Sequence, residues 1–267
     1  MSDDSPDSAQ PSLLASVVAP VKTLLEEIGV LGDLAFRAVM WTVRPPYRFQ
    51  LVIAQMEFVG VQSTFLVGLV GLFTGMVFAV QTVYGFRRFS AENMVGGVVA
   101  LTLSREMAPV LTAIMVAARA GSGMAAELGN MRSSEQIDAL ETMAVNPVQY
   151  LIVPRMIAGI VMIPVLTLVF FLVGLGGAWL VGVKWLSLDP GIFVDRIKTM
   201  LAEADLRQGL LKSVVFGFAV TLIACRHGFF ASGGAVGVGQ ATTRAVVWSV
   251  VGVFVLDYII TSMLTQV

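Results

Sequence analysis

A few charged residues stand inside otherwise apolar stretches of the chain, and these are the side chains best placed to do chemistry. Arg119 and Asp257 each interrupt an apolar stretch, and Arg105 and Glu106 open one. If such stretches cross a bilayer, charge there is costly, so a charged residue is by default a functional candidate. For Arg119 and Asp257 the structural alternative is an ion pair or a hydrogen bond to the backbone. For Arg105 and Glu106 the alternatives are an interfacial anchor and a headgroup-binding pair, because Arg binds phosphate oxygens well.

Motifs for other kinds of chemistry are missing from the sequence. One cysteine, Cys225, and one histidine, His227, exclude an internal disulfide and any metal site that needs two of either. The chain has no G-x-x-x-x-G-K-[ST] phosphate loop and no H-E-x-x-H or G-x-S-x-G pattern. We therefore expect that the chain is not an enzyme and holds no metal or cofactor, and that a partner or an ion gradient supplies energy.

The composition indicates which solvent surrounds the protein. Of the 267 residues, 57% are hydrophobic and only 13% are charged, about half the charged share of soluble domains. The mean hydropathy is +0.84. Such a sequence suits a bilayer. The net charge of −1 gives no field that would attract nucleic acid.

Five apolar stretches are candidates for membrane helices, which need about 20 residues. Two of them contain no charge at all, and three weaker ones each contain or adjoin one; the five are 58–86, 107–126, 156–183, 208–225 and 245–267. Lys212 lies near one end of the fourth, where we expect its stem to snorkel toward water. The sequence therefore predicts an all-α, polytopic integral membrane protein whose five spans put the termini on opposite sides. These spans form a membrane domain over 51–267.

The N-terminal region differs in character. Residues 1–12 are acidic and contain no Lys or Arg, which predicts a disordered tail and argues against a signal peptide. Residues 13–50 place apolar residues at helical spacing, which predicts an interfacial amphipathic region of one or two helices. The alternative is a helix that packs on a soluble partner.

The loop at 127–155 contains a predicted amphipathic helix at about 133–146. Ser133 could cap it with Gln136 as the reciprocal partner. Ile137 and Leu140 fall on one face, and acidic residues fall on another. This pattern is typical of an ordinary loop helix and also of a helix that docks on a cytoplasmic partner.

Small residues recur at four-residue spacing, as in Gly71 and Gly75 and again in Gly209, Ser213 and Gly217. Such faces let helices approach closely, either within one chain or between two copies. Loop charge does not orient the chain, because with the N-terminus inside, nine Lys and Arg residues lie inside and eight outside.

Several of these segments carry a family resemblance. The string LSREMAPVLTAIMVAARAGSGMAAELGNMR at 103–132 closely resembles the MlaE/YrbE permeases, the membrane subunits of MCE-type lipid ABC transporters. The similarity extends over roughly 55–267 through these further strings: FTGMVFAVQ at 73–81, FSAE at 89–92, EQIDALETMAVNP at 135–147, PRMIAG at 154–159, ATTRAVV at 241–247 and LDYIIT at 256–261.

The resemblance implies an ATP-driven transporter of phospholipid in the inner membrane of a bacterium. The chain would pair with a second copy of itself, with cytoplasmic ABC ATPases that bind ATP and Mg²⁺, and with periplasmic MCE-domain subunits. It would move lipid between the inner membrane and the MCE conduit and so maintain the lipid asymmetry of the outer membrane. The N-terminus would be cytoplasmic and the C-terminus periplasmic.

The resemblance also implies site residues. Arg105 and Phe89 would line a lipid cavity between two copies, with Glu106 and Phe86 beside them. The family pattern allows Tyr where this chain has Phe89, so a hydroxyl contact would be lost. The loop helix would be the coupling helix that contacts the ATPase, and the residues expected to couple are Glu127, Arg132, Glu135, Asp138, Leu140 and Glu141.

Two other classes of function compete with lipid transport. An ion-coupled secondary transporter would place Asp257 and Arg119 in the ion path, although the inverted repeat expected of such a fold is not visible. A non-transporting scaffold for an ATPase complex would leave lipid transport insensitive to changes at Arg105 or Phe89.

Overall fold

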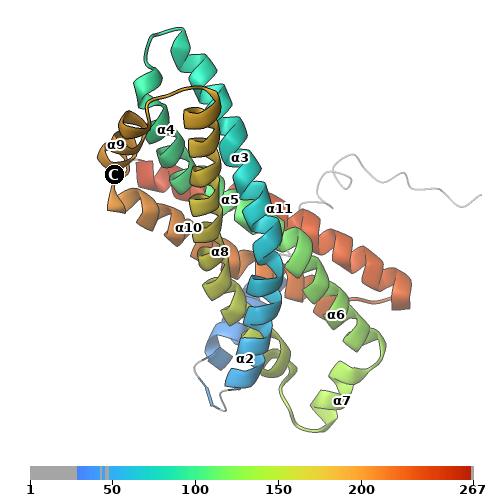
Figure 1. Ribbon diagram of the computed structural model, residues 1–267. Coiled ribbons are helices and arrows are strands. Elements are labelled where there is room, and N and C mark those ends of the chain that lie inside the picture. Colours follow the sequence, from blue (N-terminus) through green and yellow to red (C-terminus); the bar gives the residue numbers. More distant parts are fainter. Residues whose placement is uncertain (1–28, 43, 46–47, 266–267) are drawn as a thin grey trace, which may run out of the picture.

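The computed structural model describes residues 29–42, 44–45 and 48–265, and every regular element within these ranges is a helix (Figure 1). Five helical stretches are long and apolar enough to cross a membrane: Phe49–Arg87, Glu92–Ser133, Val148–Trp185, Glu203–Phe229 and Gly234–Leu264. The predicted all-α fold with five spans is confirmed. The acidic tail 1–12 and residues 13–28 of the interfacial region lie outside the described residues.

The elements follow one another along the chain as a helix at 29–42 and then the five spans with their connections. The first span consists of α2 (Phe49–Met56), a π-helical turn (Glu57–Val61) and α3 (Gln62–Arg87). The second contains a 3-10 turn (Glu92–Met94), α4 (Val95–Thr102), α5 (Ala108–Val116) and α6 (Ser122–Ser133), with π-helical turns at Leu103–Met107 and Ala117–Gly121. After α7 (Gln136–Thr142) come a π-helical turn (Val148–Ile152), α8 (Val153–Trp179), a further π-helical turn (Leu180–Trp185), α9 (Pro190–Met200), α10 (Glu203–Phe229) and α11 (Gly234–Thr265).

The second span is longer than the sequence predicts. The expected helix at 107–126 is part of a helical stretch that runs from Glu92 to Ser133. Arg105 and Glu106 were expected to begin the span, but they lie inside the stretch, in the π-helical turn Leu103–Met107. A helix can continue through these charges because both side chains are paired with residues of α10.

Glycines set the distance between neighbouring spans. A Cβ added at Gly75 of α3 would lie 1.8 Å from the carbonyl oxygen of Gly174 in α8, and one added at Gly217 of α10 would lie 2.5 Å from that of Gly159. The backbones therefore touch without side chains between them. The small-residue faces pack within the chain, as one of the two sequence interpretations expects.

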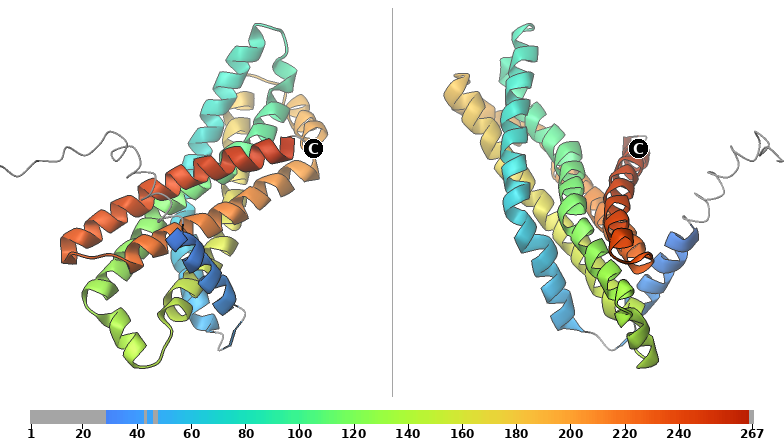
Figure 2. Two further views of the ribbon diagram at one scale, coloured as in Figure 1. Left: turned by 180° about the vertical axis from the view of Figure 1, so that it is seen from behind. Right: turned by 90° about the vertical axis from the view of Figure 1, so that its right-hand side faces the viewer.

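The spans form a layered bundle (Figure 2). α3 packs on α8, and α10 lies between α8 and α11 while α6 contacts both α10 and α11. α11 is the outermost span, with only 11% of its most apolar stretch buried against 44% or more for the second, third and fourth spans. α7 lies at one end of the bundle, and α9 and the turn after α3 lie at the other (Figure 1).

The predicted cap of the loop helix is wrong. Ser133 is the last residue of α6, and α7 begins at Gln136 after Glu135, whose φ of 59° is left-handed. Gln136 donates instead to the hydroxyl of Ser134 over 3.0 Å. The tight turn between α6 and α7 leaves no room for a capping box, since Ser133 is still helical.

Candidate functional site

A cluster of paired charges lies inside the helix bundle. Lys212 of α10 is fully buried, and its Nζ donates to Glu106 Oε2 over 2.5 Å and to Asp257 Oδ1 over 3.0 Å. The same Nζ donates to the hydroxyl of Thr261 over 2.7 Å. The ammonium thus joins the second, fourth and fifth spans, and we call Glu106, Lys212 and Asp257 the buried ion cluster.

A second ion pair adjoins this cluster. Arg105 donates to Asp205 Oδ1 through Nε over 2.7 Å and also through Nη2. Asp205 is almost fully buried, and its other oxygen accepts the backbone N–H of Ala202 over 2.8 Å, which fixes the start of α10. The side chain of Arg105 is 44% exposed. Because a guanidinium has five donors, Arg105 can hold Asp205 and still bind an anion at its exposed edge.

The sequence alone did not identify two members of this arrangement. Asp205 was not singled out, and Lys212 was expected to snorkel to water, which is wrong because its side chain is 0% exposed. The signal was present but incomplete: Asp205 and Lys212 lie seven residues apart, two turns on one face of a helix. Their partners lie about 100 and 106 residues earlier and could not be assigned from spacing.

The predicted lipid-binding residues come from two parts of the chain: Phe86 and Phe89 lie at the end of α3 and in the turn after it, whereas Arg105 and Glu106 lie inside the second span. Phe89 is 79% exposed in the turn after α3, and Phe86 is half-buried against the core. Arg105 follows the start of α4 by ten residues, about 15 Å along a helix axis. The aromatic pair therefore lies at the end of the bundle, and Arg105 and Glu106 lie further along the second span.

Arg119 links the first two spans. Its Nη1 donates to the carbonyl oxygen of Phe58 and, over 3.3 Å, to the hydroxyl of Ser63, and its guanidinium lies 5.0 Å from the Phe58 ring centroid. Nη2 donates to Gln62 Oε1. These contacts match the structural alternative for Arg119, and the pair between Asp257 and Lys212 matches the structural alternative for Asp257.

The loop helix α7 presents an acidic surface. Ile137 is fully buried and Leu140 is half-buried, whereas Glu135, Asp138 and Glu141 are exposed. Arg132 of α6 donates to Asp138 Oδ1 over 2.5 Å, so the two helices are linked by an ion pair as well as by the turn. An open groove of about 400 Å³ lies between α7 and the turn that joins α10 to α11.

Glu127, which was also expected to couple, lies in α6 and pairs with α8 instead of lying on α7. It forms an ion pair over 2.7 Å with Arg155 of α8, whose side chain is only 3% exposed. Arg155 also donates to the carbonyl oxygen of Leu151 over 2.8 Å. Glu127 therefore ties α6 to α8.

Comparisons with known proteins show which sequences this chain resembles. A protein-family model described as Permease MlaE matches residues 52–263. The intermembrane phospholipid transport system permease protein MlaE of Haemophilus influenzae is 40% identical over 238 residues, which cover 89% of this chain and 91% of that protein. A probable ABC transporter permease protein of Rickettsia prowazekii is 39% identical over 242 residues, covering 91% of this chain and 93% of its own. The chloroplastic protein TRIGALACTOSYLDIACYLGLYCEROL 1 of Arabidopsis thaliana is 38% identical over 233 residues, which cover 87% of this chain and 67% of that protein.

Proposed function

This chain belongs to the MlaE permease family, and from that premise we propose that it is the membrane-spanning subunit of an ATP-driven phospholipid transporter. The observation that carries the proposal is the match over 52–263, which contains nearly all of the five spans and the whole of α7. Lipid would pass between the inner membrane and a periplasmic conduit of MCE-domain subunits, and this traffic would maintain the lipid asymmetry of the outer membrane.

The lipid path is proposed to lie between two copies of the chain. A diacyl lipid needs a wide apolar passage, because burying each CH₂ group of its acyl chains away from water is favourable by about 0.8 kcal/mol. Arg105 would bind the phosphate through its exposed edge while Asp205 holds the guanidinium in place. Glu106 would act indirectly, because its carboxylate pairs with Lys212. Phe86 and Phe89 would contact acyl chain nearer the mouth.

The energy is proposed to come from ABC ATPase subunits that dock on α7. ATP and Mg²⁺ would bind to those subunits, and α7 would seat its exposed acidic side on them. Ion pairs connect α7 to the membrane spans, so a movement of α7 would be transmitted to them. Arg132 joins α7 to α6, and Glu127 joins α6 to α8, so a displacement of α7 moves two spans together.

The chain is proposed to place α7 in the cytoplasm and the end of α11 in the periplasm. The described helices are consistent with this orientation, because five spans put the helix at 29–42 on the side of α7 and the end of α11 on the other. The MCE subunits would then meet the end of the bundle that carries α9 and the turn after α3.

Transport by the purified assembly tests the proposal. The chain, its ATPase and its MCE partner are reconstituted in proteoliposomes that contain a fluorescent phospholipid, and transfer to a soluble acceptor is followed. We expect transfer that requires both ATP and the ATPase, and a loss of about tenfold or more in Arg105→Glu, because one charge-assisted phosphate contact contributes roughly 1.5–3 kcal/mol. Arg105→Lys, which keeps the charge, should retain part of the activity.

The same assay separates the competing functions. Transfer driven by an ion gradient without the ATPase would replace the proposal with an ion-coupled transporter. An ATPase that binds normally while no variant or nucleotide changes lipid transfer would replace it with a scaffold. Size-exclusion chromatography of each variant confirms that the assembly is intact.

A further inference from the structure

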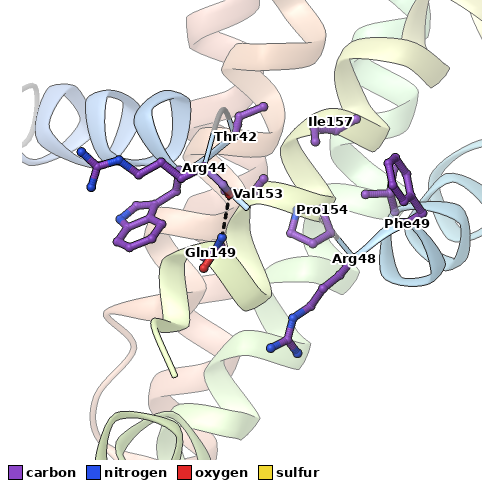
Figure 3. Close-up of a pocket in the computed structure, with 10 residues that line it drawn as sticks. Thr42, Arg44, Arg48, Phe49, Gln149, Val153, Pro154 and Ile157 are labelled. Carbon is purple, nitrogen blue, oxygen red and sulfur yellow. Dashed lines mark hydrogen bonds between the residues drawn. The ribbon is translucent and has the colours of Figure 1, made fainter. Parts of the chain in front are cut away.

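A second site lies far from the buried ion cluster, where the helix at 29–42, the start of α2 and the start of α8 meet. Figure 3 shows this pocket, which has a volume of about 70 Å³. Its floor is apolar and consists of Val52 from α2 with Val153, Pro154 and Ile157 from α8. Both spans begin here, so the pocket lies where the chain enters the bilayer.

Two arginines stand at the rim of the pocket. Arg44 and Arg48 are exposed, and each guanidinium lies over an aromatic ring, 5.7 Å from the centroid of Trp41 and 4.5 Å from that of Tyr150. A guanidinium that stacks by its face keeps the N–H donors of its edge for an anion. Neither arginine has an acidic partner within the described residues. On the same span the next acid, Glu57, is nine residues on, about 13 Å along the helix.

The surroundings of the rim are fixed and apolar. Gln149 Nε2 donates to the carbonyl oxygen of Arg44 over 3.0 Å, which ties the segment before α2 to the start of α8 (Figure 3). An open groove of about 540 Å³ adjoins the pocket and shares Arg48 and Phe49 with it. From there an apolar surface continues along α2, where Phe49 is 71% and Ile53 is 63% exposed.

We propose that this junction binds one anionic phospholipid of the leaflet on the α7 side. Arg44 and Arg48 would hold the phosphate, the pocket would take the glycerol end, and the acyl chains would lie along Phe49 and Ile53. The two arginines and the apolar floor together favour a lipid over a soluble anion. A soluble anion would make no favourable apolar contact with Val153 and Ile157. The proposal requires only that the chain spans a membrane, so it is independent of transport.

Photochemical labelling tests the site. The full chain, purified in the assembly that it forms in the cell, is placed in nanodiscs of phosphatidylcholine with one fifth phosphatidylglycerol and a trace of photoreactive phosphatidylglycerol. Peptide mass spectrometry should find label within 48–53 or 149–157. The double variant Arg44→Gln/Arg48→Gln should bind about thirtyfold more weakly, since each cation near an anionic surface contributes roughly a factor of five.

Matched variants decide what the label means. Arg37→Gln, which removes an exposed arginine that pairs with Asp33 outside the pocket, should label as the unchanged protein does, and Arg44→Lys/Arg48→Lys should keep most of the label. Equal labelling of the double glutamine variant would overturn the proposal. So would competition by inorganic phosphate at millimolar concentration, because the site would then be one for soluble anions.

Discussion

At the scale of single residues, Lys212 is the side chain whose burial costs the most free energy unless its charge is paired. Removing an ammonium from water costs several kcal/mol even after the protein relaxes, and Lys212 is completely buried. Two carboxylates and one hydroxyl offset that cost. The buried ammonium is therefore compensated only when the second, fourth and fifth spans are packed together, so the cluster favours the correctly assembled bundle over partly packed states.

Removing both carboxylates should show how much the cluster contributes. Glu106→Gln/Asp257→Asn leaves the ammonium without an opposite charge, and breaking a buried pair in this way costs about 3–5 kcal/mol. For a chain of this size we expect the melting temperature in detergent to fall by roughly 2–4 °C per kcal/mol. Asp257→Asn alone should cost less, because Glu106 still pairs with Lys212.

Adding Lys212→Met to the double variant is the informative control. The triple variant buries no charge at this point, so it should recover most of the lost melting temperature. If the double and triple variants melt together, the buried charge is not what destabilises the double variant. Asp33→Asn, at an exposed ion pair on another helix, should change stability by less than about 0.5 kcal/mol.

At the scale of elements, backbone contact decides how the spans pack. α3 and α8 approach through Gly71, Gly75 and Gly174, so their separation is fixed by residues without side chains. The spacing of Gly71 and Gly75 predicted a close helix contact but not its partner on α8. A small-residue face can pack on a helix of the same chain or on a second copy. The choice depends on how the whole bundle packs, and the residue spacing within one helix does not determine it.

Alanine at two glycines of α3 separates packing from helix propensity. In Gly75→Ala the new methyl would overlap the backbone of α8, and overpacking of this kind costs about 1–3 kcal/mol. Gly85 has open space around it, so Gly85→Ala should be neutral or stabilise the helix by up to about 1 kcal/mol. Thermal unfolding in detergent measures both. Equal effects would mean that α3 and α8 are not in contact at Gly75.

The acidic side of α7 should bind the ATPase through charge. Glu135→Lys/Glu141→Lys reverses two exposed acids and spares Asp138, which is paired with Arg132. Since like charges placed together across an interface cost several kcal/mol, we expect co-purification of the ATPase to fall by about tenfold or more while the chain still inserts. Asp195→Lys/Glu203→Lys makes the same change at the opposite end of the bundle and should leave the ATPase bound. Unchanged co-purification of the first variant would contradict docking on α7.

At the scale of the whole molecule, the sequence predicted what depends on local composition and missed what depends on assembly. Charge-free runs such as 58–86 predicted the spans, because a bilayer excludes charge from lipid-facing helices. The sequence misses the true start of the second span because Arg105 and Glu106 are typical of a membrane interface. Their partners on α10 neutralise them inside the bundle, and only the folded chain brings those residues together.

The orientation of the molecule can be tested with single cysteines, since Cys225, the one cysteine of the chain, is buried. In a Cys225→Ala background, Ser134→Cys lies beside α7 and Lys198→Cys lies on α9, at opposite ends of the bundle. A membrane-impermeant maleimide should label Lys198→Cys in intact spheroplasts and Ser134→Cys only after permeabilisation. The reverse pattern would place α7 outside, where no ATP is available to a docked ATPase, and the proposed coupling would then have no source of energy. Labelling of both positions in intact cells would place residues 134 and 198 on the same side of the membrane. That result would contradict the single span, Val148–Trp185, between them.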